Sequence, residues 1–321
     1  MGPDGVAYVG IDVGGGGIRI RAQVHGQRVG VHDQGPVPRT GGRIDAPALG
    51  ARIGGLVAGM YPGLTADRVA VGLTGMPGLL EHPAELAGHV HRRIASRTVI
   101  IAGDSLTTHL GALRGRAGCV VAAGTGVIVL GTDHATTWNR VDGWGHLLGD
   151  EGSGAWIGAR GLRAALRHHD GRDEASAALH HRLRQRFGTV DDALHAIYGS
   201  ASPAHELAAF APDVAAAAHD GDPAARQIWR RAGAHLAAAA HAAGRGLPPE
   251  YSWGGRLFDA GELLLDAFRD DLVRRVPGAR LSPPSGQAAD GALLLAQRGL
   301  PPDRPTSAPY AVEFPSSSSA G

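Results

Sequence analysis

The stretch GWGHLLGDEGSGAWIG, residues 143–158, is the most informative segment of this 321-residue chain. It is rich in glycine, which is retained where the backbone must adopt positive φ or approach a ligand closely. Asp150 and Glu151 stand just before an expected apolar helix, and the unpaired N–H groups of a helix start would stabilise their negative charge. The same pattern also fits an ordinary helix N-terminus, with Asp150 or Ser153 as the N-cap residue.

Composition indicates a globular protein with balanced charge. Arginine alone supplies the 31 fixed positive side chains against 30 carboxylates, so no basic face for nucleic acid is expected. No apolar run reaches the roughly 18 residues of a membrane span, and no signal peptide precedes the first strand. We therefore expect a cytoplasmic protein that binds neither nucleic acid nor membrane. The single cysteine, Cys119, excludes internal disulfides and cysteine clusters.

The first glycine turn lies between two predicted strands, Val6–Val13 and Ile18–Val24, and Asp12 precedes it. Without Cβ atoms, the exposed N–H groups of such a turn can surround anionic oxygens. The dinucleotide-binding fingerprint fits poorly, because it requires a helix after the glycines and here a strand follows. A plain hairpin turn is the alternative. The turn consists of Gly14, Gly15, Gly16 and Gly17.

A second hairpin with the same layout follows about 110 residues later, over Gly118–Leu130. Its turn is Gly124-Thr125-Gly126. The repetition indicates an internal duplication, and two such hairpins facing each other across a cleft would hold the phosphates of a nucleotide from both sides. A duplicated hairpin that binds nothing is the alternative.

Asp104 follows the predicted buried strand Thr98–Ala102 and precedes the predicted helix Ser105–Arg114. Chemistry in α/β folds is placed at this carboxyl edge of the sheet. A carboxylate there can accept a proton from a substrate hydroxyl as that hydroxyl attacks phosphorus. The alternative is an N-cap role.

Two further glycine-containing breaks could approach a ligand. The predicted strand Arg68–Leu73 ends at Thr74 and Gly75, and a short strand from Tyr251 ends at Gly254 and Gly255. Core packing is the alternative for the second break.

Helices are predicted to dominate the second half of the chain, among them Ala204–His219, Asp259–Arg275 and Gln287–Gln297. The alanine-rich helices between residues 200 and 245 offer a face for a homodimer. Proline and serine take over from Leu300, so the tail is expected to be disordered.

In their order along the chain, these features resemble the superfamily of acetate and sugar kinases, heat-shock proteins and actin. Within it, Gly143 to Ser153 closely resembles the N-acetylglucosamine kinase branch of the BadF/BadG/BcrA/BcrD ATPase family. The resemblance covers roughly residues 6–298, and the lysine-free composition is similar to that of actinobacterial glucosamine kinases. It implies an α/β, two-lobed, actin-like ATPase (ribonuclease H-like) fold, with duplicated mixed-sheet domains and a helical elaboration in the second.

The implied domain boundaries follow the duplication. Residues 1–116 would form the N-terminal lobe and residues 117–286 the C-terminal lobe with its helical insertion. The C-terminal helix, residues 287–299, could pack back on the N-terminal lobe, and residues 300–321 would be the disordered tail.

The resemblance also implies a glucosamine kinase that uses ATP and Mg²⁺ and phosphorylates the 6-hydroxyl of the sugar. Asp104 would be the general base, and Asp12 would hold Mg²⁺ through water. The nucleotide would contact Gly14, Gly15, Gly16 and Gly17 in the first phosphate loop, Gly124, Thr125 and Gly126 in the second, and Gly254 and Gly255 beside the adenosine. The sugar would contact Thr74, Gly75, Asp104, Gly149, Asp150 and Glu151.

One departure from the family concerns the first turn. Gly16 and Gly17 stand where threonine, often followed by lysine, is usual. We expect a differently arranged grip on the triphosphate, with Arg19 or Arg21 as substitutes.

The sequence is also compatible with other functions. An N-acetylglucosamine kinase is the alternative within the family, because the Asp150–Glu151 pair does not distinguish the two sugars. The iron–sulfur activators of the family need cysteines that this chain lacks. A non-catalytic ATP-binding sensor of the actin-like fold is the alternative from another class, and loss of Asp104 would be its mark. A DNA-binding repressor would need an N-terminal helix-turn-helix, for which the early first strand leaves no room.

Overall fold

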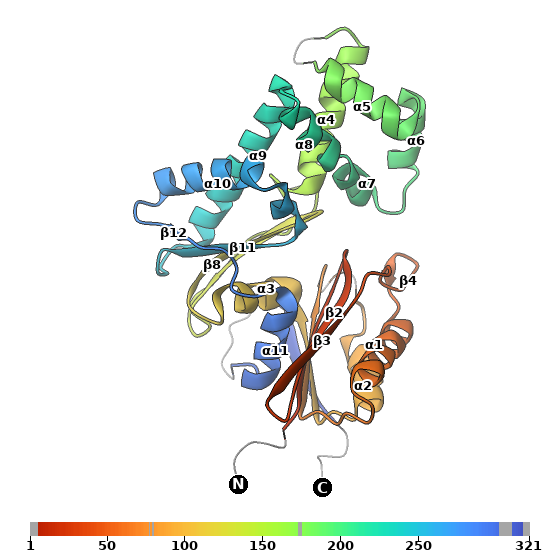
Figure 1. Ribbon diagram of the computed structural model, residues 1–321, viewed down its shortest axis with the longest axis vertical. Coiled ribbons are helices and arrows are strands. Elements are labelled where there is room, and N and C mark those ends of the chain that lie inside the picture. Colours follow the sequence, from red (N-terminus) through yellow and green to blue (C-terminus); the bar gives the residue numbers. More distant parts are fainter. Residues whose placement is uncertain (1–5, 77, 79, 173–174, 302–309, 317–321) are drawn as a thin grey trace. The chain divides into compact units, whose positions relative to one another are not determined.

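The structure is a computed structural model that describes residues 6–76, 78, 80–172, 175–301 and 310–316 (Figure 1). Contacts divide the chain into two compact units. The first unit comprises residues 1–117, 132–138 and 283–321, and the second comprises residues 118–131 and 139–282. Across these described ranges, no helix combines the length and the apolar character needed to cross a membrane.

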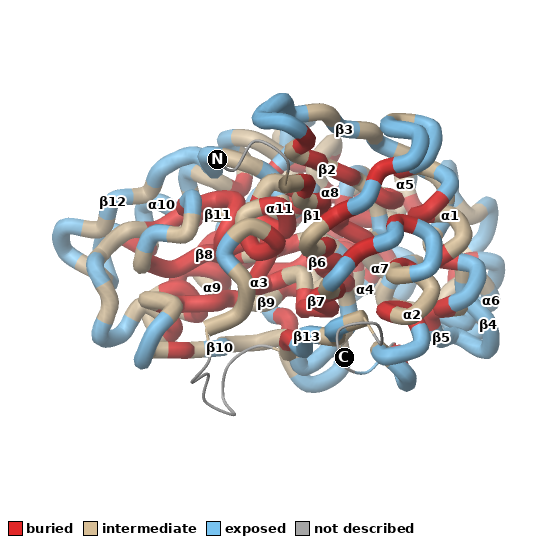
Figure 2. The backbone as a smooth tube through the Cα atoms, turned by 90° about the horizontal axis from the view of Figure 1, so that it is seen from below, coloured by how far each residue is buried: buried red, intermediate tan, exposed pale blue. Residues whose placement is uncertain are grey.

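The first unit is built on a six-stranded sheet in the order β13-β7-β6-β1-β2-β3. The central strands β1, β6 and β7 are parallel and buried almost throughout, which explains their continuous apolar sequences (Figure 2). The strands are β1 (Tyr8–Gly14), β2 (Gly17–Val24), β3 (Gln27–Asp33), β6 (Arg68–Leu73), β7 (Thr98–Gly103) and β13 (Ala311–Pro315), and the short β4 (Arg39–Thr40) pairs with β5 (Arg43–Ile44).

Helices cover both faces of this sheet (Figure 1). One face carries α1 (Ala46–Met60) and α2 (Pro83–Ile94), and the other carries α3 (Asp104–Leu113) and α11 (Ala288–Arg298). Asp45 caps α1, because its side chain accepts the N–H of Ala48 at 2.9 Å.

Helix α11 approaches the sheet and α3 at backbone distance. A Cβ on Gly10 of β1 would lie 2.0 Å from the backbone nitrogen of Leu293, and one on Gly291 would lie 1.8 Å from the carbonyl oxygen of Thr107. Glycine is therefore required at both positions, and the contact holds α3 firmly in place.

The second unit has a five-stranded sheet in the order β10-β9-β8-β11-β12, in which β11 runs parallel to β8 and β12. The strands are β8 (Gly118–Ala123), β9 (Val127–Thr132), β10 (Trp138–Asp142), β11 (Glu250–Gly254) and β12 (Arg280–Leu281). The helices are α4 (Gly154–His169), α5 (Ala177–Phe187), α6 (Val190–Tyr198), α7 (Pro203–Ala209), α8 (Ala211–His219), α9 (Pro223–Ala243) and α10 (Glu262–Arg275), with a 3₁₀ turn over Arg256–Ala260.

Two predicted helices are each divided in the structure. The helix expected over 204–219 consists of α7 and α8, which meet at Phe210, and Pro212 lies in the first turn of α8. The helix expected over 259–275 begins as the 3₁₀ turn and is interrupted by Gly261 at φ 65°. The alanine-rich face of α9 is buried inside the second unit, against α10 and α4 among others, which accounts for its alanine content.

The tail differs from the expectation of disorder. Residues 311–315 form strand β13 on the edge of the first sheet, because the sequence AVEFP contains β-prone residues that the surrounding proline and serine content outweighed in the prediction. Residues 302–309 and 317–321 of the predicted tail lie outside the described residues.

Candidate active site

Three predicted site residues of the first unit lie at the same edge of its sheet. The parallel register pairs Asp12 with Gly72 of β6 and Leu73 with Gly103 of β7. Asp12 therefore lies near the carboxyl end of β1, while Thr74 and Asp104 directly follow β6 and β7. The Thr74 side chain hydrogen-bonds the Asp104 carboxylate, so the topology brings these residues together.

The electrostatics of this edge depend on two neighbouring carboxylates. Burial, followed by the negative charge of Asp12, raises the pKa of Asp104 to about 6, although hydrogen bonds from Thr74 and the Ser105 N–H act in the opposite direction. Burial also raises the pKa of Asp12, whose residue is only 9% exposed, and the Arg19 guanidinium 3.5 Å away opposes that shift. A carboxyl group with a pKa near 6 can accept a proton at neutral pH.

Asp104 is not the N-cap of its helix. Gly103 holds that position, and Asp104 is the first residue of α3. The N-cap alternative is therefore wrong for Asp104, although its carboxylate does accept the N–H of Ser105.

The first glycine turn has an open part and a packed part. A Cβ on Gly14 or Gly15 would meet no protein atom within 4 Å. Gly17 has φ 104°, and its Cβ would lie 2.1 Å from the carbonyl oxygen of Asp33. The carbonyl oxygen of Gly16 lies 3.3 Å from Nε2 of His32. Gly14 and Gly15 therefore leave open space, whereas Gly17 packs against the end of β3.

The two arginines considered as substitutes differ in position. Arg19 lies directly opposite Asp12 in the β1–β2 register, whereas Arg21 lies 3.6 Å from Asp290 of α11. Arg19 is thus the arginine that stands next to the turn's acidic residue.

The chemistry of this edge fits Mg²⁺. Magnesium binds through one or two carboxylates and keeps several waters, with substrate phosphates as further ligands. The buried Asp12 carboxylate, with the charge of Asp104 nearby, has the donor type that Mg²⁺ prefers. Among the described residues no group of three or more His, Cys, Asp or Glu side chains could hold a metal alone, so phosphate and water would have to complete such a site.

In the second unit, helix α4 is attached to the second glycine turn. The N–H groups of Gly154 and Ala155 donate to the carbonyl oxygens of Gly124 and Thr125 at 2.8 and 3.0 Å. The next N–H, of Trp156, donates to the Ser153 hydroxyl, so Ser153 is the N-cap. The prediction that free N–H groups of this helix stabilise the acidic pair was wrong, because other oxygens occupy these N–H groups.

Asp150 connects the segment 143–158 to the turn Gly124-Thr125-Gly126. It is 6% exposed, has φ 57°, and its Oδ1 accepts the N–H of Gly145 at 3.2 Å. Its own N–H donates to Oδ1 of Asp142 at 2.5 Å, and a Cβ on Gly126 would lie 2.4 Å from its Oδ2. Gly149 is required here as well, because its Cβ would lie 2.6 Å from Oδ1 of Asp142. The contact of Asp150 with a sugar remains a prediction.

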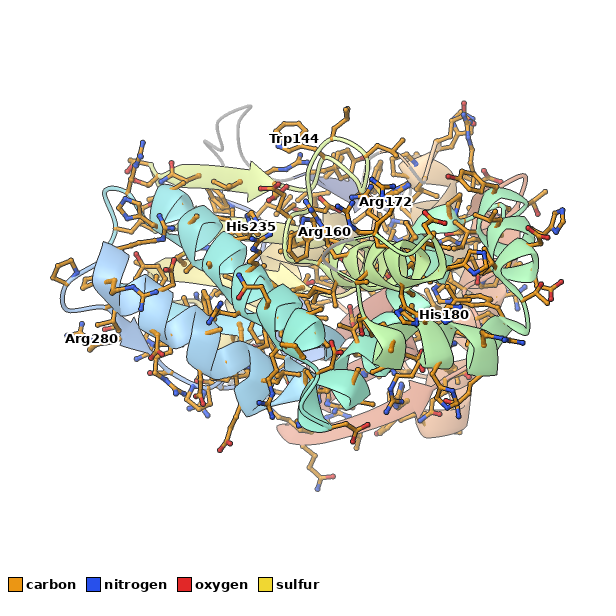
Figure 3. The ribbon with its side chains drawn as sticks, turned by 90° about the horizontal axis from the view of Figure 1, so that it is seen from above. Trp144, Arg160, Arg172, His180, His235 and Arg280 are labelled. Atoms are coloured by element: carbon orange, nitrogen blue, oxygen red, sulfur yellow. The ribbon has the colours of Figure 1, made fainter. Side chains whose placement is uncertain are left out.

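Glu151 points to a group of residues that the sequence did not indicate. Its Oε2 lies 3.1 Å from Nδ1 of His235 on α9, and the His235 ring stands 5.0 Å from the Trp156 ring. The guanidinium of Arg160 lies 5.0 Å from the centre of the Trp156 indole. Figure 3 labels Arg160 and His235. His235 is one of 17 histidines and lies in an alanine-rich helix, so no local pattern could have identified it.

The proposed adenosine loop lies next to the second glycine turn. Gly254 pairs with Ala122 in the β8–β11 register, and a Cβ on Gly255 would lie 2.1 Å from the carbonyl oxygen of Ala123. Residues 124–126 and 254–255 therefore follow adjacent parallel strands. The 143–158 segment meets the second glycine turn through Asp150 and Gly126. Its Trp144, which Figure 3 labels, is 64% exposed, and its Leu148 is 87% exposed.

Cys119 is buried, and its thiol donates to the carbonyl oxygen of Ala240 at 3.5 Å. Burial raises the pKa of this thiol, so it is neither a nucleophile nor an exposed cluster ligand.

Known proteins resemble this chain over much of its length. The sequence model of the BadF/BadG/BcrA/BcrD ATPase family matches residues 9–296. The N-acetylmuramic acid/N-acetylglucosamine kinase of Clostridium acetobutylicum is 28% identical over 205 residues, which are 62% of this chain and 67% of that protein. A solved structure from Chromobacterium violaceum, provisionally named an N-acetylglucosamine kinase, is 27% identical with a TM-score of 0.70, over 92% of this chain and 100% of the other.

A more distant structure shares the fold. The ROK family glucokinase of Streptomyces griseus, solved with glucose and AMPPNP, is 19% identical with a TM-score of 0.55, over 91% of this chain and 98% of that one.

The raised pKa of Asp104 predicts how its replacement by Asn changes stability with pH. The folded state holds this proton up to about pH 6 and the unfolded state only up to about pH 4, so the wild type loses stability as pH rises through that window. Asp104→Asn removes this loss. The free energy of unfolding of the variant minus that of the wild type should therefore increase between about pH 4 and 6 and level off above it, as measured by urea denaturation.

Asp45→Asn is the matched control, because hydrogen bonds from the Ala48 N–H and the Thr40 hydroxyl lower the pKa of Asp45. Its effect should be constant above about pH 5. A pH-independent difference for Asp104→Asn between pH 4 and 7 would contradict the raised pKa.

Proposed function

Because the chain belongs to the BadF/BadG/BcrA/BcrD ATPase family, we propose that it is an ATP-dependent hexosamine kinase. The family and the actin-like α/β fold predicted from the sequence are both confirmed. In the proposed reaction the γ-phosphate passes to the 6-hydroxyl of glucosamine, which gives glucosamine 6-phosphate. N-acetylglucosamine is the second candidate acceptor, because the names of two relatives contain that sugar.

The observation that carries the proposal is the position and pKa of Asp104. Its carboxylate would accept the proton of the sugar hydroxyl as the hydroxyl oxygen forms its bond to the γ-phosphorus and the bond to ADP breaks. A pKa near 6 leaves the group mostly ionised at neutral pH while keeping it a better base than an ordinary aspartate. Thr74, which hydrogen-bonds this carboxylate, would fix its orientation.

Backbone N–H groups of the first glycine turn and the nearby charged side chains would bind the nucleotide. Gly14 and Gly15 leave open space in which phosphate oxygens could reach backbone N–H groups. Asp12 would hold Mg²⁺ through water, and the bound ion would supply positive charge beside the phosphates. Arg19, beside Asp12, would replace the positive charge that the glycine turn lacks.

The second unit would contribute the remaining contacts. Gly124, Thr125 and Gly126 would bind phosphate, and Gly254 with Gly255 would lie against the adenosine. Glu151 is the exposed carboxylate of the acidic pair and is oriented by His235, so it is well suited to attract a protonated amine on the sugar. Asp150 is buried and would shape the loop, in addition to the contact with sugar hydroxyls that the resemblance implies.

The acceptor is tested by comparing glucosamine, N-acetylglucosamine and glucose with Mg·ATP. We expect ADP release and a sugar 6-phosphate, with kcat/KM for the hexosamine at least about tenfold above that for glucose. Glu151→Gln should reduce kcat/KM for glucosamine more than for N-acetylglucosamine, because only the former carries a charged amine. ATP binding without phosphorylation of any of these sugars would contradict the kinase and favour the sensor.

The phosphate loops are tested by Gly15→Ala and Gly124→Ala. Neither position has positive φ, and an added methyl group would meet no protein atom within 4 Å, so thermal stability should be unchanged. The methyl group would instead occupy the space of a phosphate, and ATP affinity should fall about tenfold, a cost of ~1.4 kcal/mol.

The matched control is Gly55→Ala on α1, where the added methyl group also meets no atom. Calorimetry should find wild-type ATP affinity for that variant. Equal affinity in all three variants would rule out phosphate binding at these turns.

A further inference from the structure

The described chain extends past the region that the family model matches. The match ends at residue 296, whereas β13 comprises Ala311–Pro315. This strand pairs antiparallel with β7, from Ala311 opposite Ala102 to Pro315 opposite Thr98. Since β7 leads directly into Asp104, the additional strand lies beside the element that carries the proposed base.

Contacts outside the sheet ladder fix β13 along its length. The N–H of Ser316 donates to the carbonyl oxygen of Arg97 at 2.8 Å, and Nε2 of His91 lies 3.0 Å from the carbonyl oxygen of Phe314. Glu313 forms an ion pair with Arg68 at 3.6 Å. The strand is therefore an integral part of the first unit.

The other end of the segment holds the turn before the base. The N–H of Gly103 donates to the carbonyl oxygen of Tyr310 at 2.8 Å. Gly103 is buried and is the N-cap of α3, so Asp104 is the very next residue. A buried N–H that loses its acceptor is destabilising, so this hydrogen bond helps to hold the turn.

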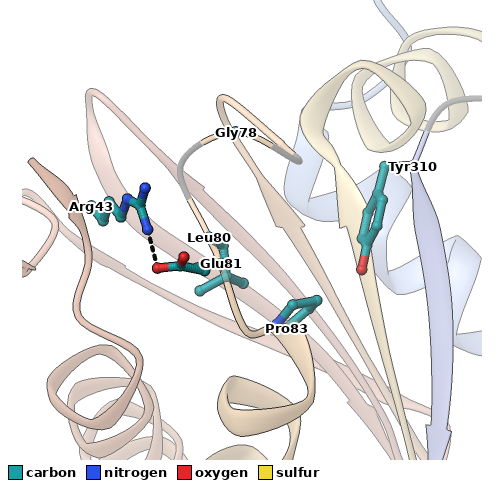
Figure 4. Close-up of a pocket in the computed structure, with 6 residues that line it drawn as sticks. All are labelled: Arg43, Gly78, Leu80, Glu81, Pro83 and Tyr310. Atoms are coloured by element: carbon teal, nitrogen blue, oxygen red, sulfur yellow. Dashed lines mark hydrogen bonds and ion pairs between the residues drawn. The ribbon is translucent and has the colours of Figure 1, made fainter.

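Tyr310 also faces a pocket beside the segment that follows Thr74. It borders a pocket of about 350 Å³ together with Gly78, Leu80 and Pro83, which follow Thr74 in the chain (Figure 4). Burial raises the pKa of the Tyr310 phenol. Tyr310 thus hydrogen-bonds the turn that presents Asp104 and borders the same pocket as residues that follow Thr74.

We propose that the C-terminal segment 310–316 is a positioning element for Asp104. The Tyr310 carbonyl holds the β7–α3 turn, and β13 holds Tyr310, so that the carboxylate keeps its orientation toward Thr74. The inference rests on the proposed function, because it takes Asp104 as the base. A purely structural strand would protect the exposed edge of β7 and change stability alone.

The first experiment compares Val312→Pro with Val312→Ala. Val312 pairs with Ile101, two residues from the hydrogen-bonded Tyr310–Gly103 pair, so the antiparallel alternation places its N–H in the ladder. Proline removes that N–H, whereas alanine keeps it, and the valine side chain is already 37% exposed. We expect Val312→Pro to lower kcat at least about tenfold with the KM for ATP within about twofold, and Val312→Ala to behave like the wild type.

The second experiment shortens the chain after Pro301 and adds back a peptide of residues 310–316, YAVEFPS. The peptide should restore kcat by adding its strand to β7, and the same peptide with proline for Val312 should not. Carbon NMR of the truncated protein, labelled at aspartate, should show the Asp104 pKa lower than in the full chain, and the peptide should reverse that change.

These measurements separate the two proposals. If the full chain phosphorylates a sugar while the truncated protein keeps its kcat and its Asp104 pKa, the positioning role is wrong. If truncation shifts the Asp104 pKa and the peptide reverses the shift, but the full chain phosphorylates no sugar, the proposed function fails while the control of the turn stands. If the truncated protein is less stable than the full chain but its folded fraction keeps the same kcat, the strand only protects the edge of β7, and the positioning role is wrong.

Discussion

The burial of the Asp104 carboxylate at a sheet edge that also carries Asp12 is the constraint on which the rest of the proposed site depends. Burial of the Asp104 carboxylate, followed by the negative charge of Asp12, raises the pKa of Asp104 to about 6. Helix α3, which begins with Asp104, packs against α11 at backbone distance. The same negative charge creates a demand for a cation, met in part by Arg19.

In the second unit, the feature that matters is how the turn Gly124-Thr125-Gly126 is held by its neighbours. The first N–H groups of helix α4 donate to the carbonyl oxygens of Gly124 and Thr125, and these hydrogen bonds fix the turn to the helix. Asp150 accepts the N–H of Gly145 and donates its own N–H to Asp142, and its Oδ2 lies against Gly126 of the turn. Glu151 is left exposed and paired with His235. The glycine-rich segment is therefore a rigid support for the turn, with one carboxylate on its exposed side.

The parts that could be predicted are those governed by local pattern. The apolar runs of β1, β6 and β7 predicted buried strands, and Asp104 was expected at the carboxyl edge of a sheet. The parallel register, which the structure supplies, places Asp12 and Thr74 at the same edge. The pairing of Glu151 with His235 could not be predicted, because it joins positions far apart in the chain. Strand β13 was missed because only Val312 and Phe314 of its five residues are β-prone and they stand within a proline- and serine-rich tail; the edge of β7 gives the segment its partner.

The most direct test of Asp104 as the base is a single-turnover measurement with Asp104→Asn, using enzyme in excess over ATP and saturating sugar. We expect the rate of phosphoryl transfer to fall by about 10²–10⁴-fold, while calorimetry finds ATP and sugar bound within about threefold of wild-type affinity. A transfer rate close to that of the wild type, with both ligands bound, would contradict the account.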